Sequence, residues 1–433
     1  MKNNPIKRAV ILVQHFLKKY VTSLTFLVFL LALEACDFEV NPDNQENTNI
    51  ISTNFRAFFD AYWREMNRSY VFWDIDGTDW DKVYTEYAPK FDTLEIGNQA
   101  HEKIAGMYFR EILSGLSDSH YNVDFSSFRG MTQNDTIING LFLPGTSFSP
   151  ALWRKAQTEN FYLGLLDPAT PDLYADVDFQ NYLDPENRYR VSTDNGGLTK
   201  PEELLVGTIQ QKILYIRIST FNLTSRYSFD NKVREVLNFF FKTLAAIPSN
   251  KIKGVIVDVR QNGGGDLRDL NLLMGRFVSK PTHFGYQHYK NGDNRLDYTP
   301  WLPFFVKPNL ELNPNPKDCP VPVIALIDAH SISMAEITAL AIRGLSEKNK
   351  LIGETTWGAM GALTDKNILT GGSFTIGINR ASYTYTSSAA TVDKQFKSYE
   401  GKGIPPDMKV QYDPVSLGEG IDRQLEAAIQ QFN

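Results

Sequence analysis

The sequence predicts an α/β fold built on buried parallel strands, with a small helical bundle before it. Residues 254–259 (GVIVDV) and 321–327 (VPVIALI) are short apolar runs, typical of strands that are covered on both faces. Residues 334–345 are apolar nearly all round, which is typical of a buried helix. An aromatic stripe at helical spacing in residues 55–63 predicts the bundle. Alternation of such strands and helices favours an α/β core.

The composition places the chain among ordinary globular proteins. It has 433 residues, of which 42% are hydrophobic and 22% charged, and this excludes disordered and disulfide-scaffold classes. A chain of this length usually forms two or three domains. The net charge of −6 argues against a nucleic-acid partner, because nucleic-acid-binding proteins normally carry a basic excess.

The first 36 residues have the pattern of an export signal. Residues 1–35 contain five lysines and arginines against one glutamate, and residues 21–33 form an apolar run that is short for a membrane span. The run ends at Leu33-Glu34-Ala35-Cys36, which resembles a bacterial lipobox. The resemblance implies a signal peptide over residues 1–36 and a lipid on Cys36. It predicts an exported lipoprotein of the cell envelope, anchored at the periplasmic or outer-membrane face; the alternative is an uncleaved signal anchor.

Cysteine usage agrees with a chain that is held together by its core. Cys36 and Cys319 are the two cysteines of the sequence, so a lipidated Cys36 would leave a single thiol and no disulfide. Cys319 lies in a proline-rich approach to a strand with no histidine near it in sequence. We therefore interpret Cys319 as structural rather than nucleophilic.

The first half of the chain divides into three segments by pattern. Residues 37–53 are polar and predict a tether. An N-terminal helical subdomain is predicted over residues 54–125, because residues 55–66, 80–91 and 100–116 have helical periodicity. Residues 126–200 are rich in Asp, Asn, Pro and Tyr and predict an irregular connecting region.

Residues 201–433 are predicted to form the α/β core. The expected strands are residues 203–209, 213–218, 254–259 and 321–327. The expected helices are residues 229–244, 267–274, 334–345 and 422–432.

Two strand-to-helix turns in this core could carry chemistry. In the first, the strand at 254–259 runs through Arg260 into Gly263–Gly265, where backbone N–H groups could face an anion or simply make a tight turn. Phosphate-loop and dinucleotide patterns are absent from this segment. In the second, Ser333 would lie at a helix N-terminus, where orphan N–H groups stabilise negative charge. Its spacing from Glu336 also fits a capping box, so Ser333 could merely cap the helix.

Three motifs in order resemble the C-terminal-processing (tail-specific) serine peptidase family, which has a crotonase-like α/β fold. They are residues 260–265, the turn at 331–336, and residues 353–358 (GETTWG). The resemblance is strongest over residues 252–406. It implies that Ser333 is the nucleophile and that Gly263, Gly264 and the N–H of Met334 form the oxyanion hole.

The general base departs from the common branch of that family. Ala359 stands where that branch has the lysine of a Ser–Lys dyad, and alanine cannot accept a proton. The segment Asp118-Ser119-His120 is similar to the Asp-x-His element of the tricorn-core branch, which uses a histidine base. Residues 400–407 (EGKGIPPD) resemble its glutamate motif. The resemblance thus implies His120 as general base and then acid, with Ser119 and Glu400 as orienting groups.

These observations predict a serine-type endopeptidase that cleaves unfolded proteins or oligopeptides outside the cytoplasm. No cofactor and no metal site are predicted, since zinc-site spacings are absent. Residues 132–195 lack a convincing PDZ carboxylate-binding loop, so tail specificity is not predicted. One alternative is a catalytically inactive lipoprotein that binds a peptide or apolar ligand on the same fold. Another is crotonase-type acyl-thioester chemistry, which would require coenzyme binding.

Overall fold

The computed structural model describes most of the chain after the predicted tether. The described residues are 50–52, 54–124, 137–138, 141–142, 147–148, 150–151, 179–193, 202–247, 249, 251–362, 373–376, 381–385 and 387–433. The predicted signal peptide, Cys36, nearly all of the tether and most of residues 126–200 lie outside them. Residues 47–433 form one compact unit. None of the helices in the described part is both long enough and apolar enough to cross a bilayer.

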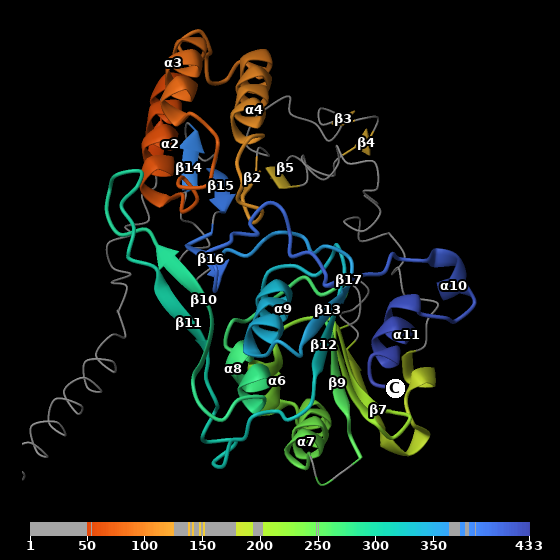
Figure 1. The fold of residues 1–433 in the computed structure, drawn as a ribbon. Coiled ribbons are helices and arrows are strands. Elements are labelled where there is room, and N and C mark those ends of the chain that lie inside the picture. The colour runs from red at the N-terminus through yellow and green to blue at the C-terminus, as the bar shows by residue number, and fades with distance from the viewer. Residues whose placement is uncertain are drawn as a thin grey trace, which may run out of the picture. The chain divides into compact units, whose positions relative to one another are not determined.

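A seven-stranded mixed sheet forms the centre of this unit (Figure 1). Its strands, in spatial order, are β17 (Met408–Lys409), β13 (Lys350–Gly353), β12 (Val323–Ile327), β9 (Gly254–Asp258), β8 (Ile213–Ile218), β7 (Glu202–Ile209) and β6 (Arg188–Thr193). The strands from β17 to β8 are parallel, whereas β6, β7 and β8 pair antiparallel. The carboxyl ends of β9 and β12 therefore lie side by side, which brings the two turns singled out in the sequence together.

Helices cover both faces of the sheet, which explains the continuous apolar strands. Successive residues of a strand point to opposite faces, so Val255 packs in one core and Ile256 in the other. The larger core lies under α6 (Leu223–Phe229), α7 (Asn231–Ala245), α8 (Asp269–Leu273) and α9 (Met334–Leu345). The second core lies under α10 (Pro414–Gly418) and α11 (Arg423–Gln430).

The N-terminal helices form the predicted bundle around an aromatic core. They are α2 (Phe55–Ser69), α3 (Trp80–Phe91) and α4 (Gln99–Leu113), and Asn54, Asp79 and Asn98 cap them by accepting backbone N–H groups with their side chains. The stripe of residues 55–63 is buried, with Phe59 stacked on Phe91 at 4.6 Å between ring centroids. This stripe is therefore core, as predicted, rather than a ligand platform.

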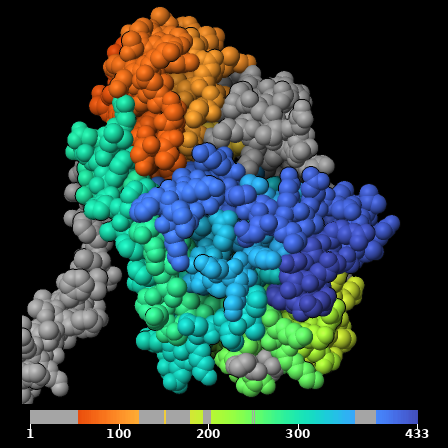
Figure 2. Space-filling model, viewed as in Figure 1, coloured from red at the N-terminus to blue at the C-terminus, as the bar shows by residue number. Residues whose placement is uncertain are grey.

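Smaller elements join the bundle to the central sheet. A five-stranded sheet contains β1 (Ile50–Ser52), β14 (Ser373–Ile376), β15 (Ala381–Tyr385), β2 (Asn122–Asp124) and β5 (Ser147–Phe148). A three-stranded sheet contains β11 (Leu302–Val306), β10 (Thr282–Tyr289) and β16 (Ala389–Asp393), and β3 (Ile137–Ile138) pairs with β4 (Leu141–Phe142). Short 3₁₀ turns lie at Phe179–Tyr182, Pro185–Asn187 and Met274–Arg276. Figure 2 shows the N-terminal helical bundle, in orange, beside segments from the C-terminal part of the chain, in blue, on one face of the molecule.

The predicted α/β class with an N-terminal helical region is confirmed, with local differences. The helix predicted over residues 229–244 is α7, which begins at Asn231 because the Asp230 carboxylate caps it by accepting the N–H groups of Lys232 and Val233; the short helix α6 before it was not predicted. The sequence predicted parallel strands in the core, whereas β6 and β7 pair antiparallel at one edge of the sheet. Strand β6 begins inside the region that the sequence predicted to be irregular.

Candidate active site

Ser333 lies in the turn that joins β12 to α9, with an unusual backbone conformation. Its φ of 58° and ψ of −115° are rarely adopted by residues other than glycine. Such conformations persist where the surrounding structure holds them, and they are enriched at functional sites. The Glu336 carboxylate holds this one by accepting the Ser333 N–H at 3.0 Å. Ser333 is half-buried, so its side chain can still be reached by solvent.

The glycine loop after β9 packs directly against this turn. A Cβ atom on Gly264 would lie 2.7 Å from the Ser333 Cβ, so only glycine fits there. Ile332 donates its N–H to the carbonyl oxygen of Asn262 at 2.9 Å, and this bond ties the turn to the loop. The N–H of Gly264 donates to Asn262 Oδ1 at 2.8 Å. Within the described residues, the N–H groups of Gly263 and Met334 have no acceptor.

The buried Glu336 side chain connects Ser333 to residues 356–359. Its Oε1 accepts the Thr356 hydroxyl at 2.5 Å and the Gly358 N–H at 2.7 Å. Its Oε2 accepts the Ala359 N–H at 2.7 Å as well as that of Ser333. Burial raises the pKa of Glu336, and these hydrogen bonds oppose the rise by stabilising the carboxylate.

A second buried carboxylate, that of Glu400, carries the connection to His120. Its Oε2 accepts the N–H groups of Met360 at 2.7 Å and Gly361 at 3.0 Å. Its Oε1 accepts the N–H of Ser119 at 2.8 Å. Burial, together with the nearby charge of Asp118, raises the pKa of Glu400 well above its ordinary value. Residues 358–361 thus lie between two carboxylates, one bonded to Ser333 and the other to Ser119.

His120 lies in the loop between α4 and β2. Its backbone N–H donates to Asp118 Oδ1 at 2.9 Å, and its ring Nδ1 lies 3.3 Å from Ser387 Oγ. Burial of the ring lowers the pKa of His120 below 6.5, against the opposing charge of Asp118. The neutral imidazole is therefore the main form at pH 7. Among the described residues no hydrogen bond joins Ser333 directly to His120.

The structure thus places the predicted site residues in two groups joined by residues 358–361. Ser333, Gly263, Gly264 and Met334 follow the ends of β9 and β12, whereas His120 and Ser119 belong to a loop that is bonded to the joining segment through Glu400. Ala359 is fully buried and packs with Ala151 and Trp357. Lys366, the next lysine in the sequence, lies outside the described residues.

Two residues of this region were missed by the sequence reasoning. A sequence signal for Asp118 existed, because it forms part of the Asp-x-His element that identified His120. No sequence signal pointed to Ser387, because it is separated from His120 by 267 residues and belongs to no motif. Ser387 follows β15, and the antiparallel pairing of β15 with β2 brings it close to the His120 ring.

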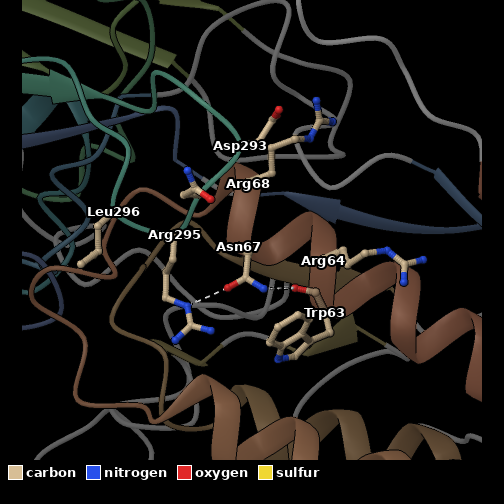
Figure 3. Close-up of a pocket in the computed structure, with 8 residues that line it drawn as sticks. Trp63, Arg64, Asn67, Arg68, Asp293, Arg295 and Leu296 are labelled. Atoms are coloured by element: carbon tan, nitrogen blue, oxygen red, sulfur yellow. Dashed lines mark hydrogen bonds between the residues drawn. The ribbon is translucent and has the colours of Figure 1, made fainter.

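An open cavity of about 570 Å³ lies elsewhere, between α2 and the connection from β10 to β11. Figure 3 shows Asn67 between Arg295 and Trp63 in this cavity, with hydrogen bonds to both. Its Arg68 and Arg295 are paired with Glu65 and Asp81. None of the predicted site residues lines this cavity.

Comparison with known protein families gives two matches. Residues 212–410 match the model of peptidase family S41, and residues 52–95 match that of the tricorn protease C1 domain. The first of these models describes a family of peptidases. Its match covers β8 to β17 and therefore includes the Ser333 turn, the glycine loop and Glu400.

Among curated proteins, the chain is similar to tricorn protease of Thermoplasma volcanium, with 26% identity over 195 residues, 45% of this chain and 16% of that protein. It is also similar to the nisin-resistance protein of Lactococcus lactis subsp. lactis, with 25% identity over 197 residues, 46% of this chain and 58% of that protein. The matched segment therefore spans less than two thirds of either relative.

Two solved structures share the fold. A protein of Parabacteroides merdae, described as a candidate peptidase, has a TM-score of 0.56 and 22% identity, over 88% of this chain and 97% of that one. The mature form of CPAF has a TM-score of 0.52 and 13% identity, over 87% of this chain and 97% of that one. At these identities the likeness concerns the fold.

Proposed function

We propose that this chain, whose residues 212–410 match peptidase family S41, is a serine-type endopeptidase with Ser333 as nucleophile and His120 as general base. One observation carries the proposal. The buried carboxylates of Glu336 and Glu400 hold the Ser333 turn and the His120 loop to the same four residues, 358–361. A serine and a histidine 213 positions apart in the sequence (333 against 120) are thereby tied into one buried network.

In the proposed mechanism, His120 Nε2 removes the proton of the Ser333 hydroxyl as its oxygen attacks the peptide carbonyl. The negative charge that develops on the carbonyl oxygen is stabilised by the N–H groups of Met334 and Gly263, which have no acceptor in the described residues. The imidazolium then protonates the leaving amine, and an acyl-enzyme remains on Ser333. Attack by water, with His120 again as base, releases the second product and restores the serine.

The proposed substrates are unfolded proteins or oligopeptides. Family S41 supports a peptide substrate, whereas the location rests on the first 36 residues of the sequence. We propose export to the cell envelope and a lipid anchor on Cys36, because a basic start and an apolar run precede that residue. Mass spectrometry of the protein isolated from membranes, with a Cys36→Ser variant as control, would test the anchor.

Labelling with a fluorophosphonate tests the proposed nucleophile. The folded protein should incorporate one fluorophosphonate per chain, and peptide mass spectrometry should locate it on Ser333. Activation by a neighbouring base is what distinguishes such a serine from the others in the chain. Heat-denatured protein serves as control and should not be labelled. If the folded protein is not labelled but binds peptide saturably, the chain is instead a catalytically inactive peptide-binding protein. The alanine at position 359, where the common branch has a lysine, would then be a sign of a lost active site.

The pH dependence of turnover tests the proposed base. Because burial lowers the pKa of His120, the acid limb of kcat/KM should have its midpoint below pH 6.5. Activity is lost on that limb as protons bind His120, since the imidazolium cannot accept the serine proton. The measurement needs a substrate without titratable groups, and a check that the protein stays folded at each pH. A midpoint above 6.5 would contradict His120 as the base.

A further inference from the structure

We propose that Ser387 and Asp118 form a relay that sets the orientation and tautomer of the His120 ring. The inference rests on the proposed function, because it assigns positioning residues to the same site. It adds to the expectation that Ser119 and Glu400 orient the ring; Glu400 contacts this loop through the backbone N–H of Ser119.

The three side chains form a continuous line of hydrogen bonds. Ser387 Oγ lies 2.9 Å from Asp118 Oδ1 and 3.3 Å from His120 Nδ1. The Asp118 carboxylate is itself fixed, because Oδ2 accepts the Ser387 N–H at 2.7 Å and Oδ1 accepts the His120 N–H at 2.9 Å. Asp118 and Ser387 are both fully buried. In the described part of the chain, Ser387 is the hydrogen-bond partner of the His120 ring.

The chemistry of these groups fixes the direction of each hydrogen bond. An ionised carboxylate can only accept, so the single hydroxyl proton of Ser387 points to Asp118. The lone pairs of Ser387 Oγ then face the imidazole, and Nδ1 must carry the ring proton. This leaves the lone pair on Nε2, which is the atom that has to accept the proton of Ser333.

The relay also provides for the charge that forms during the reaction. When Nε2 takes the Ser333 proton, the ring becomes an imidazolium and both of its nitrogens become donors. Nδ1 continues to donate to Ser387, which continues to donate to Asp118, so no proton leaves the relay. The negative charge of Asp118 faces the new positive charge across one hydroxyl group, and Asp118 and Ser387 are both buried, which strengthens this interaction.

Gly361 leaves the space that Ser387 occupies. A Cβ atom on Gly361 would lie 2.1 Å from Ser387 Oγ and 3.0 Å from the Phe72 ring. The same glycine donates its N–H to Glu400. Two positions after Ala359, which stands in place of the lysine, Gly361 therefore leaves room for Ser387 beside His120.

The test is the Ser387→Ala variant. Loss of the hydroxyl should lower kcat about 100-fold, within the range that general-base catalysis contributes, and change KM less than about threefold. The imidazolium would lose a hydrogen-bond acceptor, so the acid limb of kcat/KM should move to lower pH. In protein labelled with ¹⁵N-histidine, the His120 resonances should change from the Nδ1–H tautomer toward Nε2–H. A His120→Gln variant assigns those resonances.

Ser388→Ala is the matched control, because Ser388 donates its hydroxyl to the Ala362 carbonyl at 2.7 Å and not to the ring. That variant should keep kcat, the pH profile and the ¹⁵N shifts. Unchanged ¹⁵N shifts in Ser387→Ala would overturn the relay whether or not the protein is active. Failure of the wild type to react with a fluorophosphonate would overturn the proposed function instead, so the two failures can be told apart.

Discussion

Replacement of Ser333 by alanine is expected to abolish peptide hydrolysis in a protein that remains folded. Removal of the nucleophile of a serine peptidase lowers kcat by roughly 10⁴ to 10⁶-fold, because base and oxyanion hole no longer have an attacking group to act on. The fold should persist, because the Glu336 carboxylate bonds the backbone N–H of Ser333, so the variant keeps this half of the capping box and loses only the half made by the serine hydroxyl. An alanine at φ 58° is about as strained as the serine, so thermal stability should change little.

The measurement is hydrolysis of an unfolded protein and of a fluorogenic peptide, with circular dichroism and a thermal melt on the same samples. Ser346→Ala is the matched control, because Ser346 ends the helix that Ser333 begins and contacts no site residue. That variant should cleave at the wild-type rate. Equal activity of the Ser333→Ala protein would remove Ser333 from the mechanism and leave the peptide-binding alternative.

The sequence predicted the core of this fold well because burial leaves a local pattern. Strands β8 and β12 and helices α3 and α9 are found at or within two residues of their predicted bounds. The strands of the smaller sheets were not predicted. In β10 and β11, polar and aromatic residues mix without a clear period of two, so no local pattern marks them as strands although Phe284 and Val306 reach the larger core.

The candidate site was predictable only where it follows a motif. Ser333, the glycine loop and Glu400 lie in motifs whose spacing is local; the glycine loop packs against the Ser333 turn, and Glu336 and Glu400 both bond residues 358–361. The partners of His120 could not be derived this way. Contact between Ser387 and Asp118 depends on tertiary pairing across 269 residues, and no periodicity reports such a pairing. The sequence could not show which way the Gly264 N–H points; in the structure it donates a hydrogen bond to Asn262 Oδ1.

A buried charge cluster behind the glycine loop leads to the second large expected effect, on stability. The fully buried Arg260 guanidinium lies 2.6 Å from Asp258 Oδ2 and 2.7 Å from Asp422 Oδ2. Burial raises the pKa of Asp258, but the charges of Arg260 and Arg217 outweigh it and lower that pKa to about 2. Arg260 thus joins the end of β9 to the N-cap of α11, at the base of the loop that contacts Ser333.

Arg260→Met is therefore expected to destabilise the fold by about 3 to 5 kcal/mol, because it leaves two carboxylates buried without their shared cation. Urea unfolding near pH 7 measures this, and Arg268→Met is the matched control. Arg268 is 73% exposed and pairs with Asp266 at the surface, so its loss should cost less than about 1 kcal/mol. Equal destabilisation by the two variants would contradict a stabilising role for the cluster.

The destabilisation caused by Arg260→Met should also depend on pH. A carboxyl whose folded pKa is about 2 against an ordinary 3.8 contributes stability above pH 4 that is lost as the pH falls toward 2. In Arg260→Met the share of that contribution that comes from Arg260 is absent, and Asp258 keeps only Arg217, at 3.3 Å, as a cationic partner. The difference in unfolding free energy between wild type and variant should therefore shrink as the pH falls from about 4 to about 2. A difference that stayed constant over this window would mean that the arginine acts through packing and not through the charge of Asp258.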